Sequence, residues 1–335
     1  MHRRDFLTWA SLAGLQLVLP SSAGFANPGC ETSQTGLLLD PFFLKHSMGP
    51  GHPETPERLK LVESRLQSAE VFEALQVFNT SGSAENLVSL IHTQRHIDSI
   101  KARHPVSHEV VCRIIDGASL AADMVMRGDI KNAFCAVRPP GHHAENTGRI
   151  EGFCLYNSIA VLARYLQQEH GLKRILIIDW DYHHGNGTES AFYTDPSILF
   201  FSSHDQFAYP GTGSPHRTGS GEGEGYNINV HLPCGATDDD IVNAFSSKLL
   251  PAAEAFKPEF ILISAGFDSR KQDSLGCFDI TDDGFRELTR MTMALADKHC
   301  QGRIISMLEG GYNLQGNAEA TLCLLYTSDA ADDRT

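Results

Sequence analysis

The feature that most restricts the fold is a series of short, continuous apolar runs that alternate with helix-like stretches. Strands that are apolar on both faces are typical of parallel sheets covered by helices on both sides. The chain has 335 residues, enough for one large core, so we expect a single α/β domain with a mainly parallel sheet. Predicted strands span 133–138, 174–179, 198–202, 226–231, 259–265 and 303–308, and predicted helices span 156–169, 238–256 and 281–299.

Polar side chains follow several of these strands, where parallel sheets bind ligands. The run 174–179 ends in Asp179, which Asp181 and His183 follow at alternate positions. If the chain stays extended there, these three side chains share one face, whereas alternate residues such as Tyr182 take the other. Buried carboxylates are costly unless they are paired or bind a metal. The spacing therefore favours a metal site, with a hydrogen-bonded polar network as the alternative.

Asp268 ends another predicted strand and would complete an oxygen, nitrogen, oxygen ligand set with Asp181 and His183. Three protein ligands and one open position are typical of catalytic zinc. Fe(II), Mn(II) or Co(II) would accept the same donors.

Other residues at strand ends supply groups for hydrolysis. His142 and His143 follow the rigid segment RPPG, and a neutral imidazole near a metal is a natural general base. Tyr312 follows two glycines, and its phenol could donate to a carbonyl oxygen as negative charge develops. Together these groups predict a hydrolytic site.

Motifs that carry these residues resemble those of the histone deacetylase superfamily. This superfamily includes class II histone deacetylases, bacterial histone-deacetylase-like amidohydrolases and acetylpolyamine amidohydrolases. The resemblance covers about residues 37–322 and implies the arginase/deacetylase fold, an open, mainly parallel eight-stranded sheet with helices on both faces. The motifs are GHPETPERL (51–59), RPPGHHAE (138–145), GFCLYN (152–157), DWDYHHGNGTE (179–189), YPGTG (209–213), SAGFDS (264–269) and EGGYN (309–313).

The resemblance implies one zinc ion per chain and a structural potassium ion. The residues that match the zinc ligands are Asp181, His183 and Asp268. The residues that match the potassium site are Asp179, Asp181, His183 and Ser202.

The catalytic groups are also implied by this resemblance. His143 matches the general base and acid, and Asn186 matches its supporting residue; class I enzymes carry Asp there, so Asn resembles class II. Asp179 matches the carboxylate that orients His142, and Tyr312 matches the catalytic tyrosine. The residues that match the acyl-lysine tunnel are Gly152, Phe153, Tyr209 and Leu275.

The implied reaction is the zinc-dependent removal of an acetyl or related acyl group from an amine. The substrate would be an acyl-lysine peptide or a small acylated amine or polyamine. Carboxylester hydrolysis at the same site, a binuclear manganese ureohydrolase and a non-catalytic binder of acylated ligands remain alternatives. Neither the acyl group nor the oligomeric state is set by the sequence.

Two segments depart from the family pattern. Family members carry an Asp-rich loop in the region where this chain reads 101–111, and Glu109 is the only acid of that segment. We therefore expect a loop with different contacts to the substrate. The segment 323–335 fits no family pattern, so we expect the catalytic domain to span 27–322 and the tail to be a truncated or cloning-derived end.

The N-terminus predicts export. Arg3 and Arg4 precede a short apolar run and then small residues up to Ala26, which is the order of a signal peptide and resembles bacterial twin-arginine signals. We expect residues 1–26 to be cleaved, with no stable membrane insertion afterwards and a periplasmic or secreted location. The net charge of −14 argues against unspecific nucleic-acid binding.

Overall fold

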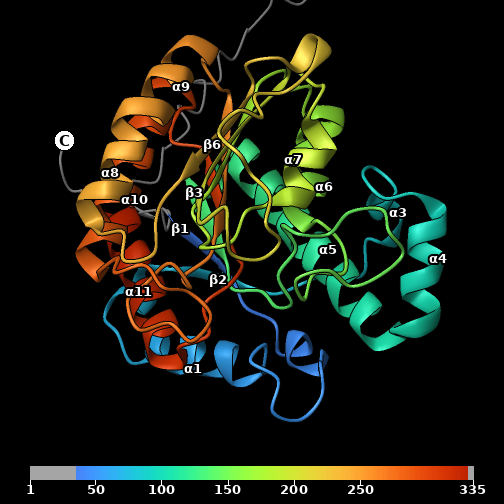
Figure 1. Ribbon diagram of the computed structural model, residues 1–335. Helices are drawn as coiled ribbons and strands as arrows, with labels where there is room; N and C mark the ends of the chain where they lie inside the picture. Colours follow the sequence, from blue (N-terminus) through green and yellow to red (C-terminus); the bar gives the residue numbers. More distant parts are fainter. Residues whose placement is uncertain (1–34, 331–335) are drawn as a thin grey trace, which may run out of the picture. The chain divides into compact units, whose positions relative to one another are not determined.

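A sheet of eight parallel strands forms the centre of residues 35–330, which the computed structural model describes (Figure 1). The strands are β1 (Thr35–Leu38), β2 (Gln76–Phe78), β3 (Asn132–Cys135), β4 (Ile175–Asp179), β5 (Ile198–His204), β6 (Asn227–His231), β7 (Phe260–Ala265) and β8 (Ile304–Leu308). Their order is β2-β1-β3-β8-β7-β4-β5-β6, and all neighbours are parallel. The predicted open α/β sheet is confirmed.

Helices cover both faces of the sheet. They are α1 (Glu57–Gln67), α2 (Val71–Ala74), α3 (Glu85–Val88), α4 (Gln94–Arg103), α5 (Pro105–Arg127), α6 (Ser158–Glu169), α7 (Asn186–Phe192), α8 (Asp238–Ala244), α9 (Leu250–Phe256), α10 (Asp282–His299) and α11 (Leu314–Ala330). A π-helical turn, Phe245–Leu249, joins α8 to α9, and 3₁₀ turns span Pro41–Lys45 and Gly221–Gly223.

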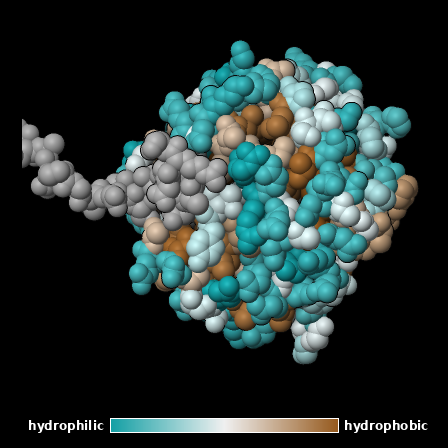
Figure 2. All heavy atoms as spheres, turned by 90° about the vertical axis from the view of Figure 1, so that its left-hand side faces the viewer, coloured by the Kyte–Doolittle hydropathy of each residue, from teal (hydrophilic) through white to brown (hydrophobic). Residues whose placement is uncertain are grey.

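The helices and the sheet form three layers. In Figure 1, α8 to α11 lie on one side of the sheet and α5 to α7 lie on the other. Figure 2 shows the α8–α11 side, whose surface is mainly hydrophilic with small, separate hydrophobic patches. The covering helices thus bury their apolar sides on the sheet, and every residue of β4, β7 and β8 is buried. Burial on both faces explains why these strands lack an alternating polar pattern.

The six predicted strands correspond to β3–β8, and the predicted helix 238–256 is one unbroken helical run. Two strands, β1 and β2, are not predicted from the sequence. They contain only four and three residues, which is too short for a periodic pattern to emerge.

The segment 101–111 is helical, which corrects the prediction of a loop. Helix α4 ends at Arg103, and α5 begins at Pro105 after a single intervening residue. Proline suits the first helical position because its missing N–H would have no partner within the helix. Glu109 lies on α5 and pairs with Arg113 at 3.0 Å. Residues 101–111 therefore belong to two helices that meet at His104.

Helix α11 crosses the predicted domain boundary at residue 322. Cys323, Leu324 and Leu325 are buried, and α11 packs along α1 and α10. The first part of the 323–335 segment therefore belongs to the core. That the segment is a truncated or cloning-derived end stays a prediction. The predicted signal peptide, 1–26, lies outside the described residues. Within residues 35–330, every helix is too short or too polar to span a bilayer.

Candidate active site

The three predicted metal ligands meet beyond the carboxyl ends of β4 and β7. The chain bends after the end of β4, which turns Asp181 and His183 toward Asp268. His183 Nδ1 lies 3.1 Å from Asp181 Oδ1 and 3.0 Å from Asp268 Oδ2. One ligand atom from each side chain lies within 4.8 Å of the other two. A compact oxygen, nitrogen, oxygen set fits a zinc ion or another divalent transition metal.

The two carboxylates of this set lie in a buried site with no exposed surface. Burial and the charge of Asp181 raise the pKa of Asp268 to about 7. Burial also opposes the ionisation of Asp181, but His142 and His183 outweigh it and hold the pKa of Asp181 below its ordinary value. Buried like charges are costly unless cations balance them. The electrostatics therefore agree with a metal site.

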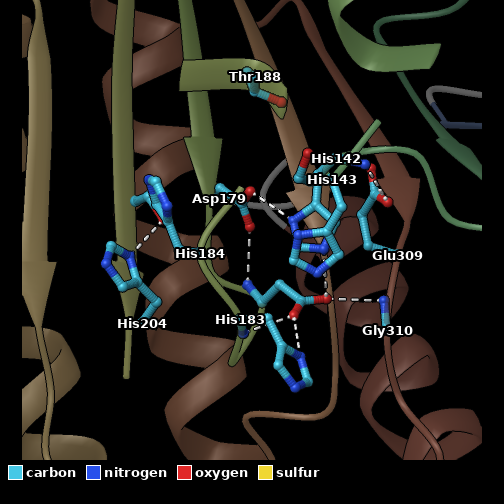
Figure 3. A network of polar contacts seen from close by, with 12 residues as sticks. His142, His143, Asp179, His183, His184, Thr188, His204, Glu309 and Gly310 are labelled. Carbon is cyan, nitrogen blue, oxygen red and sulfur yellow. Dashed lines mark hydrogen bonds and ion pairs between the residues drawn. The ribbon is translucent and has the colours of Figure 1, made fainter. Parts of the chain in front are cut away.

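The tandem histidines lie side by side and have different partners, and Figure 3 shows the contact of His142 with Asp179. His142 Nδ1 lies 2.9 Å from Asp179 Oδ2, and His143 Nδ1 lies 2.8 Å from Asn186 Oδ1. Burial opposes the charged form of His142, but Asp179 and Asp181 raise its pKa well above 6.5. Burial and the nearby charge of His142 lower the pKa of His143 well below 6.5. His143 is therefore the neutral imidazole of the pair at neutral pH.

Glu309 follows β8 and holds the loop that carries His142 and His143 (the histidine loop); the sequence places an acid at this strand end but predicts no role for it. Its Oε2 accepts from the backbone N–H groups of Gly141 at 2.6 Å and His142 at 3.2 Å. The next residue, Gly310, donates its N–H to Asp181 Oδ2 at 2.9 Å (Figure 3). Burial raises the pKa of Glu309 to about 7. One short segment thus positions both a histidine loop and a predicted metal ligand.

A cavity of about 440 Å³ is lined by His183 of the predicted metal set and by His143 and Tyr312. The rings of His143 and Tyr209 meet edge to face with centroids 5.0 Å apart, and those of Phe153 and Tyr312 do so at 5.7 Å. All four predicted tunnel residues therefore border one space. The full lining is His143, Gly152, Phe153, Tyr182, His183, Ala208, Tyr209, Leu275 and Tyr312.

The position of Tyr182 differs from the one that strand alternation predicts. An extended chain would turn Tyr182 away from the site, yet Tyr182 lines the cavity. The physical reason is that β4 ends at Asp179 and the chain bends at once, so strand alternation no longer applies. Asp179 itself is held behind His142, and its register partner on β5 is Ser202.

Tyr312 is held by contacts on both sides of its backbone. Its N–H donates to Asp273 Oδ2 at 2.7 Å, and the carbonyl of Gly311 accepts from Arg58 Nε at 2.7 Å. The Arg58 guanidinium also lies 4.8 Å from the centre of the Tyr312 ring. Burial raises the pKa of Tyr312 well above 10. The phenol therefore stays protonated and can donate a hydrogen bond.

Gly152 leaves space for the imidazole of His143. Its φ is +50°, and a Cβ added there would lie 2.1 Å from His143 Cδ2 and 2.8 Å from Tyr209 Cε1. We expect Gly152→Ala to displace His143 and to lower turnover by at least about 10-fold. Gly171→Ala is the matched control because its φ is +69° and no atom lies within 4 Å of the added Cβ. Equal turnover of the two variants would contradict this explanation.

Comparison with known proteins agrees with the geometry. The histone deacetylase domain family matches residues 52–327. A probable deacetylase of Archaeoglobus fulgidus is 36% identical over 298 residues, which cover 84% of this chain and 82% of that protein. Histone deacetylase 15 of Arabidopsis thaliana is 39% identical over 322 residues, but the match covers 89% of this chain and only 57% of the plant protein.

A solved structure shares the fold. The crystal structure of the HDA15 HD domain superposes with a TM-score of 0.83 at 35% identity, and the match covers 89% of each chain. The expected deacetylase architecture is thus confirmed, and the chain belongs to the histone deacetylase domain family.

Proposed function

We propose that this chain is a zinc-dependent deacetylase that hydrolyses the amide bond of an acylated amine. The observation that carries the proposal is one cavity lined by neutral His143, Tyr312 and His183, where His183 belongs to the compact set that Asp181 and Asp268 complete. A general base, an oxyanion donor and a cation site in one cavity are the parts that metal-assisted hydrolysis needs.

The three ligand residues would hold the zinc ion, whose chemistry is to polarise a carbonyl group and to make a water molecule more acidic. His143 removes a proton from the attacking water and later gives it to the leaving amine. The Tyr312 hydroxyl donates to the oxygen on which negative charge develops. His142, paired with Asp179, keeps a positive charge next to the reacting groups.

The substrate class follows from the walls of the cavity. Phe153 and Tyr209 present aromatic rings to a space of about 440 Å³, which suits the uncharged alkyl part of an acyl-lysine or a small acylated amine.

We also propose export to the periplasm or beyond by residues 1–26, and a potassium ion near Asp179 and Ser202. The register pairing of these two residues on β4 and β5 supports the second proposal.

A substrate panel tests the activity. Zinc-loaded protein is assayed with an acetyl-lysine peptide, an acetylated polyamine and an aryl acetate, and we expect turnover of at least one amide. Turnover of the ester alone would favour the carboxylesterase alternative. Two manganese ions per chain in the isolated protein, together with urea release from a guanidino substrate added to the panel, would establish a ureohydrolase. If zinc-loaded protein hydrolyses none of the panel, the deacetylase proposal fails and a non-catalytic binder gains.

Replacing one ligand tests the zinc site. We expect Asp268→Asn to lower bound zinc from about one ion per chain to a small fraction, because an amide binds zinc far less well than a carboxylate. Asp279→Asn is the control because Asp279 is exposed. Metal analysis after dialysis gives the result. Equal zinc in Asp268→Asn and the control would remove Asp268 from the ligand set.

A further inference from the structure

The hydrogen bond between His143 and Asn186 poses a chemical problem that the pair alone does not solve. His143 Nδ1 faces Asn186 Oδ1 at 2.8 Å. A neutral imidazole carries one N–H, so a donating Nδ1 leaves Nε2 free to accept a proton from water. An asparagine amide, however, has an oxygen at one corner and an NH₂ group at the other. Rotated by half a turn, Asn186 would impose the wrong tautomer on His143.

Glu145 lies where it can prevent that rotation. Asn186 Nδ2 donates to Glu145 Oε1 at 2.7 Å, which is the shorter of its contacts, since the carbonyl of His143 is 3.5 Å away. An ionised carboxylate only accepts hydrogen bonds. If the amide rotated, its oxygen would face the carboxylate oxygen without a proton between them. The carboxylate therefore selects one of the two amide orientations.

Backbone contacts hold His143, Asn186 and Glu145 in place. The N–H groups of Gly187 and Thr188, in the first turn of α7, donate to the carbonyl of His142 at 3.0 and 3.2 Å. A Cβ on Gly187 would lie 2.5 Å from the carbonyl oxygen of Ala144. The histidine loop and the start of α7 thus pack together without room for a side chain, and Glu145 meets Asn186 as a result.

We propose that Glu145 is a positioning residue that fixes the amide of Asn186 and thereby holds His143 as the Nδ1-protonated tautomer. The inference rests on the proposed deacetylase function for its kinetic consequence, but the tautomer of His143 is a property of the protein alone. Glu145 and Asn186 both line a second cavity of about 640 Å³, and Glu145 is not among the residues that line the cavity of His143 and Tyr312, so Glu145 acts through Asn186 rather than on the substrate.

A double-mutant cycle tests the proposal, since aspartate at position 186 has no wrong orientation. In the wild-type background, we expect Glu145→Ala to lower kcat about 10-fold with little change in KM. In the Asn186→Asp background, the same change should cost nothing or raise kcat, because it removes a second carboxylate next to the new one. The effect of Glu145→Ala on kcat should therefore differ between the wild-type and Asn186→Asp backgrounds. Such a difference is expected only when the two residues are energetically coupled.

The tautomer is read directly in metal-free protein by long-range ¹H–¹⁵N NMR of the imidazole of His143. We expect the Nδ1-protonated form in wild type, a mixture in Glu145→Ala and a return to the Nδ1-protonated form in the double variant. Glu169→Ala, which removes an exposed acid at the end of α6, should match wild type. Additive effects on kcat, or an unchanged tautomer in Glu145→Ala, would overturn the proposal.

The two arms separate this inference from the proposed function. If wild type hydrolyses no substrate, the deacetylase proposal fails and the NMR result alone decides the role of Glu145. If wild type is active and the spectra of wild type and Glu145→Ala are identical, the positioning role fails and the proposed function stands. Equal unfolding midpoints of all four proteins in the cycle would show that kcat reports on the site and not on a damaged fold.

Discussion

Replacing Tyr312 by phenylalanine is expected to lower deacetylase turnover by about 10²–10³-fold, the loss typical when one oxyanion donor is removed. The reason is local, because the ring of Tyr312 lies in the cavity beside Phe153 and its phenol stays protonated. Phenylalanine keeps the ring contacts and removes only the hydroxyl. The change should therefore appear mainly in kcat, with KM little altered.

Two controls define what the Tyr312→Phe result means. Zinc content should equal that of wild type, since Tyr312 is not among the three clustered ligand residues. Tyr326→Phe should keep full turnover, because Tyr326 is an exposed tyrosine on α11. Unchanged turnover in Tyr312→Phe would refute the role of the phenol as oxyanion donor. A loss of zinc would instead mean that Tyr312 supports the metal site.

Much of this site can be predicted because its residues stand at strand ends. The strand β4 is an apolar run, and a parallel sheet brings the ends of β4 and β7 to one edge. That geometry alone places Asp181, His183 and Asp268 near one another. The resemblance to the family then adds the roles of His143 and Tyr312, which spacing cannot assign.

Other parts of the site could not be predicted from local pattern. Glu309 holds the backbone of Gly141 from 168 positions away, and Arg58 reaches the carbonyl of Gly311 across 253 positions. The periodicity of apolar residues along the sequence carries no information on contacts between such distant positions. The predicted orientation of Tyr182 is wrong for a different reason. Strand alternation holds only within a strand, and β4 ends at Asp179.

The buried ion pairs of Glu54 show the same dependence on tertiary structure. Glu54 accepts from Arg138 Nε at 2.9 Å and Nη2 at 2.6 Å, and it lies 3.4 Å from Arg58 Nη1 and 3.2 Å from His46 Nε2. The four side chains are fully buried. One carboxylate thus balances two interior guanidinium groups, and one of these, Arg58, also supports the Tyr312 segment.

Replacing Glu54 by glutamine is therefore expected to lower the free energy of unfolding by about 3–5 kcal/mol, the cost typical of leaving a buried charge without its partner. Glutamine keeps the size of the side chain, so the loss reports on charge rather than on a cavity. Glu57→Gln is the control, because Glu57 and its partner Lys60 are exposed and such pairs contribute about 0–1 kcal/mol. Urea denaturation at pH 7 measures both variants.

The pH dependence of this loss provides a second test. Burial opposes the charge of Glu54, but His46, Arg58 and Arg138 outweigh it and lower the pKa of Glu54 from 4.5 to about 2. A lowered folded-state pKa means that the stabilisation is complete above pH 4.5 and is lost as the pH falls toward 2. The stability gap between wild type and Glu54→Gln should therefore be constant from pH 7 to 5 and narrow below pH 4.5. A gap that stays constant down to pH 3, or one below about 1 kcal/mol at pH 7, would show that the buried carboxylate does not stabilise the fold through its charge.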